Sequence, residues 1–122
     1  MQRLILGVLL VTVTTALAQG QAASATIKGY VIDSACLFIK NLEKPISREC
    51  ALKCAKAGSP LVILADDGTF YLPISSEMPA TGQNGRLMKF AGERVIVRGK
   101  VFERGGSHAV VIDEINEEPA AK

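Results

Sequence analysis

The chain has 122 residues, of which 48% are hydrophobic and 21% are charged, and its formal net charge is +2. This length suits a single domain, and a composition this apolar excludes an intrinsically disordered chain. A net charge this small gives no indication of a nucleic-acid partner or of an anionic membrane surface as a partner.

The N-terminal residues have the pattern of a signal peptide. A short positive stretch with Arg3 precedes an apolar run over residues 4–13, and Ala16-Leu17-Ala18 forms an A-x-A cleavage site. The apolar run is shorter than a membrane-spanning helix, which takes roughly 20 residues. We therefore expect a periplasmic or secreted protein that is cleaved after Ala18 and has no membrane anchor once the signal peptide is removed.

The mature chain shows alternating strand and helix signals. Runs of β-branched and apolar residues predict five strands, at residues 26–33, 61–65, 69–74, 94–103 and 108–115. Ser47 as N-cap and Gly58 as terminator predict a helix over residues 48–57, and a shorter helix is expected over residues 86–91. Asp66-Asp67-Gly68 predicts a tight hairpin turn between the second and third strands.

This order of elements indicates a fold class. Five strands with a helix between the third and fourth is the order of the OB barrel. We expect a mainly β protein, a small five-stranded OB-like barrel with a cysteine-bearing helix between strands 1 and 2, while an open α+β sandwich is the alternative. The domain is expected at residues 26–116, between a flexible lead-in at 19–25 and a polar tail at 117–122.

The three cysteines are the only concentrated chemistry in the sequence. Cys36 follows the first strand, and Cys50 and Cys54 lie four residues apart on one face of the expected helix. The leading hypothesis is a structural disulfide from Cys36 to Cys50 or Cys54, which would stabilise the fold by about 3 kcal/mol. A bond between Cys50 and Cys54 is disfavoured because side chains on one helix face fit the S–S torsion poorly. The unpaired thiol could then join two chains as a disulfide-linked dimer.

The same cysteines could instead bind a metal ion. Cu(I) and Zn(II) both favour thiolates, and Asp33 or His108, the only histidine, could supply a further ligand. The spacing C-x13-C-x3-C is not an established zinc pattern, and there is no C-x-x-C motif of the thioredoxin type. No cofactor is predicted under the leading hypothesis, and Cu or Zn is the alternative.

Three stretches of the chain resemble a group of small secreted bacterial proteins of unknown function. They match the patterns G-x-x-x-D-S-x-C at residues 29–36, E-C-x-x-x-C-x-x-x-G at 49–58 and A-G-x-x-V-x-V-x-G at 91–99. The resemblance covers most of residues 27–115 and implies an OB-like extracytoplasmic domain, without an activity. Many members carry a histidine between the first two cysteines, and this chain has none. If that histidine were a ligand, its absence would weaken the metal hypothesis.

No catalytic constellation is found in the sequence. His108 is expected on a strand distant from Asp33-Ser34, so a catalytic triad is disfavoured. The basic residues of the expected strand at 94–103 are typical of a solvated face, and we expect no nucleic-acid partner. The sequence therefore predicts an exported, non-enzymatic binding or structural module with an unknown ligand. The alternatives are a periplasmic thiolate protein for Cu or Zn and an oligosaccharide-binding OB domain.

Overall fold

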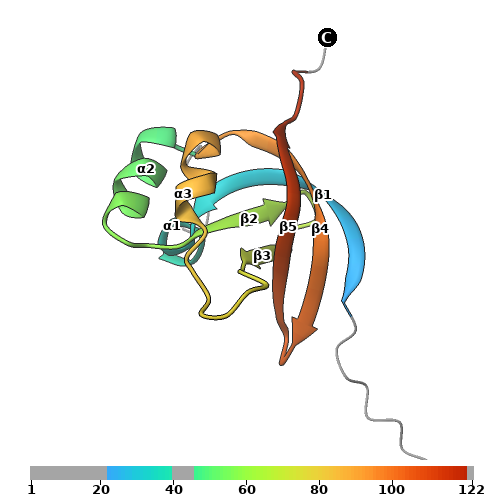
Figure 1. Ribbon diagram of the computed structural model, residues 1–122. Helices are drawn as coiled ribbons and strands as arrows, with labels where there is room; N and C mark the ends of the chain where they lie inside the picture. The colour runs from blue at the N-terminus through green and yellow to red at the C-terminus, as the bar shows by residue number, and fades with distance from the viewer. Residues whose placement is uncertain (1–21, 40–45, 121–122) are drawn as a thin grey trace, which may run out of the picture.

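The computed structural model describes residues 22–39 and 46–120, and the expected signal peptide lies outside these residues (Figure 1). Within them the chain forms β1 (Ala23–Asp33), α1 (Ser34–Ile39), α2 (Arg48–Lys56), β2 (Leu61–Ala65), β3 (Phe70–Pro73), α3 (Asn84–Leu87), the 3-10 turn η1 (Met88–Phe90), β4 (Arg94–Arg104) and β5 (Ser107–Glu117).

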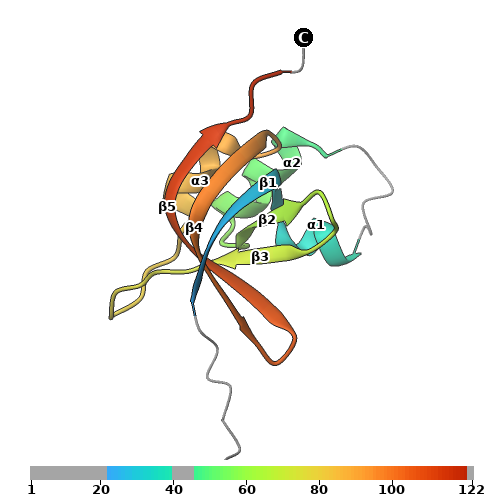
Figure 2. The same cartoon turned by 90° about the vertical axis from the view of Figure 1, so that its right-hand side faces the viewer.

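The strands close into a barrel in the order β1-β2-β3-β5-β4. β3 and β5 pair in parallel, whereas all the other neighbouring strands pair antiparallel. Helices α1 and α2 lie together beside the barrel, away from the tip of the β4–β5 hairpin (Figures 1 and 2). The predicted five-stranded OB-like barrel, with a cysteine-bearing helix between strands 1 and 2, is thus confirmed, and the sandwich alternative is wrong.

Several element boundaries differ from those expected. β1 begins at Ala23, inside the segment expected to be a flexible lead-in, because residues 23–25 pair with residues 99–101 of β4. β5 extends to Glu117, whose register partner is Val95 of β4. The short helix α1 was not expected from the sequence. Pairing along β4, which has 11 residues, therefore extends β1 and β5 beyond the apolar runs from which they were predicted.

The hydrophobic core fills the barrel and continues under α2. Val31, Ile63 and Val97 are fully buried inside the strands, as expected for inward-facing positions. Ala51 and Ala55, one turn apart on α2, are buried in the same cluster. Because alanine is small, α2 can approach the barrel closely on this face, which fixes the orientation of the remaining helix faces.

Two glycines allow the strands to approach closely. A Cβ atom at Gly29 would overlap the main-chain carbonyl of Leu64, and a Cβ atom at Gly99 would overlap that of Val111. The β4–β5 register also shifts at Gly99, where a bulge lies. Glycine at these two positions is therefore required by close backbone contact, and at Gly99 also by the shift in register.

Candidate metal centre

The first cysteine is positioned by the N-terminus of α1. Asp33 ends β1 with no exposed surface, and its Oδ2 accepts a hydrogen bond of 2.9 Å from the backbone N–H of Cys36. This contact makes Asp33 the N-cap of α1, because the third residue of a helix has an N–H group without an intrahelical partner. Cys36 is therefore held rigidly at the point where the barrel strand turns into the helix.

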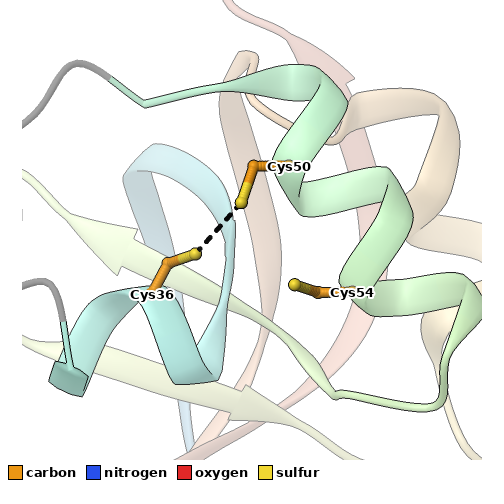
Figure 3. Close-up of side chains that lie close together, drawn as sticks. All are labelled: Cys36, Cys50 and Cys54. Atoms are coloured by element: carbon orange, nitrogen blue, oxygen red, sulfur yellow. Dashed lines mark hydrogen bonds between the residues drawn. The ribbon is translucent and has the colours of Figure 1, made fainter.

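The second and third cysteines are positioned by α2. Ser47 caps this helix as predicted, and its Oγ accepts a hydrogen bond of 3.2 Å from the backbone N–H of Cys50. Ala51 and Ala55 face the barrel, so Cys50 and Cys54, one residue before each, lie on a neighbouring stripe of the helix. Figure 3 shows this stripe turned toward α1.

The three sulfur atoms meet between α1 and α2. The Sγ atoms of Cys36 and Cys50 lie 3.6 Å apart, and all three Sγ atoms lie within 4.8 Å of one another (Figure 3). All three side chains are half-buried, and all three cysteines are free. The approach of Cys36 to the two cysteines of the helix, which the disulfide and the metal hypotheses both require, is therefore confirmed.

Loops from elsewhere in the chain hold this junction together. The hydroxyl of Ser59 donates to Oδ1 of Asp33, and the backbone N–H of Ser34 donates to the carbonyl of Pro60 at 3.0 Å. Asn84 in α3 donates from its amide to the carbonyl of Ser59 at 2.8 Å and accepts from the N–H of Leu61 at 2.9 Å. These bonds connect the end of α2, the start of β2 and the start of α1.

The surroundings favour the neutral form of two of the thiols. Burial raises the pKa of Cys36 to about 12, and the hydrogen bond to Cys50 and the charge of Asp33 act in the same direction. Burial also raises the pKa of Cys54, followed by the charges of Asp33 and Cys50. A thiol with a raised pKa is a poor nucleophile at neutral pH. Cys36 and Cys54 therefore do not have the lowered pKa that is typical of a redox-active cysteine.

The distances match metal coordination better than a covalent bond. A disulfide requires the sulfurs to be about 2.05 Å apart, and no pair of cysteines is at that distance, so the expected disulfide is not shown. Two thiolates bound to one Zn(II) at about 2.3 Å in tetrahedral geometry lie about 3.8 Å apart. The observed 3.6 Å between Cys36 and Cys50 is close to this value.

The two candidate fourth ligands do not join the sulfurs. The group of potential ligand atoms lying within 4.8 Å of one another contains the three cysteines alone in the described part of the chain. Asp33 is adjacent, but both of its carboxylate oxygens already accept hydrogen bonds. His108 lies in the β4–β5 hairpin, where its ring packs against Tyr71 and its Nε2 is 3.7 Å from Glu103.

Sequence reasoning missed the cap formed by Asp33 and the roles of Ser59 and Asn84. A signal for the cap was present, because an aspartate at an N-cap commonly accepts a hydrogen bond from the backbone N–H three residues later. It was overlooked because α1 has only six residues and no acidic residue in its first turn. Ser59 and Asn84 gave no local signal, because their hydrogen-bond partners are far away in the sequence. Ser59 bonds Asp33, 26 residues before it, and Asn84 bonds Ser59, 25 residues before it.

The fold and the site together define a small OB-like barrel with a clustered three-thiol centre. Comparison of the chain with protein-family models, curated proteins and solved structures gave no match.

Proposed function

We propose that this protein is an exported, non-enzymatic binding module that holds one soft metal ion on the thiolates of Cys36, Cys50 and Cys54. The observation that supports this function is the convergence of all three sulfurs within 4.8 Å of one another. Thiolates are the preferred ligands of Cu(I) and Zn(II). Two of the ligands come from one helix and the third from another, so the barrel fixes their separation before any ion binds.

The second ground for this proposal is that the ligands are already oriented. Cys36 and Cys50 each follow a capping side chain by three residues, and both backbone N–H groups are bonded to that cap. Ligand residues whose backbone is already held by hydrogen bonds lose less conformational entropy when an ion binds. A site built in this way is expected to bind its ion without a change in the barrel.

Metal loading tests this function directly. Reduced protein is mixed with Cd(II), which is also thiophilic, passed through a desalting column, and analysed for metal and for free thiols. We expect one ion per chain and loss of the reactivity of all three thiols, because each becomes a ligand. The Cys54→Ser variant should lose the ion, whereas His108→Ala, which changes a residue outside the cluster, should keep it. Absence of bound metal with three reactive thiols would overturn the proposal.

A structural disulfide is the second candidate, and the contact of 3.6 Å between Cys36 and Cys50 favours that pair over the other two. Thiol titration of denatured protein without reductant separates the candidates. One free thiol per chain indicates a disulfide, for which Cys36 and Cys50 are the expected pair. No free thiol with a doubled mass indicates a dimer linked through the remaining cysteine. Three free thiols are expected if the cluster serves as a metal site.

Export is the part of the proposal that rests on the N-terminal sequence. The described helices include none that is both long and apolar enough to cross a bilayer. Sequencing the N-terminus of the protein isolated from its native compartment should give Gln19 as the first residue. A protein that retains Met1 inside the cell would contradict this part of the proposal and would leave the metal site unaffected.

A further inference from the structure

The number of available ligands restricts which ion the cluster can prefer. In the described residues the cluster supplies three sulfurs and no nitrogen or oxygen. Structural Zn(II) sites almost always have four protein ligands, and Zn(II) sites with three protein ligands take water in the fourth position. Cu(I) prefers soft thiolates and is stable with only three of them. Thiolate ligands alone suit both Zn(II) and Cu(I), but the number of ligands in the cluster favours Cu(I).

The two residues that could complete a tetrahedral site are committed elsewhere. Oδ2 of Asp33 bonds the N–H of Cys36 and Oδ1 bonds the hydroxyl of Ser59, so a turn of this carboxylate toward an ion would break the cap of α1. Asp33 is also fully buried, which restricts the movement of its side chain. His108 is the second residue of β5, pairs with Glu103 across the β4–β5 hairpin, and packs its ring against Tyr71. The tip of this hairpin lies away from helices α1 and α2 (Figure 1).

The spacing of the sulfurs is compatible with a planar site as well as with a tetrahedral one. An ion at the centre of three sulfurs, with bonds of about 2.3 Å, places the sulfurs about 4.0 Å from each other. The observed separations include 3.6 Å for Cys36 and Cys50, and none of the three exceeds 4.8 Å. Small changes in the side-chain torsions, moving each sulfur by a few tenths of an ångström, would make the triangle regular. Figure 3 shows the three sulfurs facing one another across a common centre.

Net charge acts in the opposite direction. Three thiolates with Cu(I) carry a charge of −2, whereas with Zn(II) they carry −1, and the neighbouring Asp33 carboxylate makes either site more negative. This electrostatic difference favours Zn(II). We give the ligand count more weight, because half-buried sulfurs remain partly screened by water, which weakens the effect of charge. With the described residues alone, Zn(II) would have to take water as its fourth ligand, whereas Cu(I) needs no fourth ligand.

We propose that the cluster is a three-coordinate thiolate site that selects Cu(I) over Zn(II). This inference rests on the proposed function, since it names the ion that the same three cysteines hold. Copper bound in this way is fixed by Cys36 from α1 and by Cys50 and Cys54 from α2, with Asp33 positioning Cys36 through its backbone and not touching the ion.

Competition between the two metals tests the inference. Under anaerobic conditions, reduced protein is loaded with one equivalent of Zn(II), and Cu(I) is then added from a chromophoric Cu(I) chelator while a zinc indicator reports released Zn(II). We expect one equivalent of Cu(I) to displace the zinc fully. X-ray absorption at the copper edge should show three sulfur neighbours and no nitrogen or oxygen. Zinc that stays bound against equimolar Cu(I), or copper with two sulfurs or with a nitrogen or oxygen ligand, would overturn the inference.

The variants distinguish failure of the inference from failure of the function. Cys50→Ser should lower the affinity for Cu(I) by roughly 100-fold or more, since even changes in residues next to ligands lower affinity about 10–100-fold. Asp33→Asn should leave three sulfurs around copper, and a change in coordination number would show that the carboxylate is a ligand. His108→Ala is the matched control and should bind copper like the parent protein. Protein that binds neither metal contradicts the proposed function itself, whereas tight zinc binding without displacement contradicts the choice of copper alone.

If a cysteine variant is poorly folded, its loss of binding would not by itself support the site. The free energy of unfolding of each metal-free variant is therefore measured by denaturant titration. Cys50→Ala serves as a second substitution, because a small apolar side chain suits a half-buried position without adding a hydroxyl. Folded variants of both kinds that still bind Cu(I) as the parent does would exclude Cys50 as a ligand.

Discussion

Cys36 and Cys50 are 14 residues apart in the chain, yet their Sγ atoms lie 3.6 Å apart and each cysteine is the third residue of a capped helix. The caps are different residues, Asp33 and Ser47, but they make the same kind of bond to the cysteine N–H. The two sulfurs therefore meet because two helix starts are fixed against the same end of the barrel.

The metal-free, reduced protein should lose stability at alkaline pH. The pKa of the Cys36 thiol is about 12 in the fold, compared with 9.0 as its ordinary value. A raised pKa means that folding favours the protonated thiol, so this contribution is fully present below pH 9 and is lost as the pH rises toward 12. Denaturant titrations at several pH values should show the decrease. In Cys36→Ser the decrease in stability should be smaller over the same pH range. Lysines also titrate in this range, and the comparison separates their effect from that of Cys36. Equal slopes in both proteins would contradict this account.

Replacing Asp33 should destabilise the protein and change the thiols. Asp33→Ala removes the cap of α1 and the partner of Ser59, and the loss of a buried cap with unsatisfied donors is expected to cost about 2–4 kcal/mol. Asp33→Asn keeps an oxygen acceptor but removes the negative charge, so it should lower the pKa of Cys36 and of Cys54 with a smaller loss of stability. Alkylation rates of the thiols measured against pH report the change in pKa, and denaturant unfolding reports the loss of stability. Unchanged alkylation in Asp33→Asn would show that the carboxylate does not influence the sulfurs.

A side chain at Gly29 should disrupt the barrel. The added Cβ atom in Gly29→Ala would overlap the carbonyl of Leu64 on the neighbouring strand, and neither backbone can move without breaking the β1–β2 pairing. We expect a loss of about 3 kcal/mol or more, at the upper end of overpacking effects. Gly85→Ala is the control, since nothing lies within 4 Å of its added Cβ atom, and it should change stability by less than about 1 kcal/mol. Thermal unfolding of the two variants side by side gives the comparison.

Removing the amide of Asn84 should loosen the junction between α2 and β2. The side chain accepts from Leu61 and donates to Ser59 and Ala55, all in part-buried surroundings. Asn84→Ala should cost about 1–3 kcal/mol because it leaves buried main-chain groups without partners. Amide hydrogen exchange should be faster at Leu61, whose N–H is exchanged only when this bond opens.

Two further substitutions define the role of Asn84. Asn84→Asp retains the acceptor for Leu61 but places a carboxylate oxygen against the carbonyls of Ser59 and Ala55, which repel it, so this variant should be at least as destabilised as Asn84→Ala. Gln83→Ala removes an exposed amide that bonds only the carbonyl of Thr81, and it should be close to neutral. If Gln83→Ala were as damaging as Asn84→Ala, the effect would belong to the loop and not to the buried amide.

Much of the fold could be predicted from local patterns. The hairpin turn at Asp66-Asp67-Gly68, the Ser47 cap and the terminal Gly58 each depend on a few adjacent residues, and Gly58 and Gly68 indeed have positive φ angles. The order of strands and helices followed from these signals, and OB-like closure followed from the order. The bounds of β1 and β5 were missed because pairing with β4, and not residue type, extends them.

The sequence by itself determined that three thiols belong to this protein, that two share a helix face, and that the helix starts at Ser47, because these properties depend on composition and on helical periodicity. Only the tertiary structure decided that Cys36 joins them, that Asp33 is committed to capping α1, and that His108 lies elsewhere. Contacts of that kind depend on how the closed barrel brings distant segments together, and no local pattern contains that information.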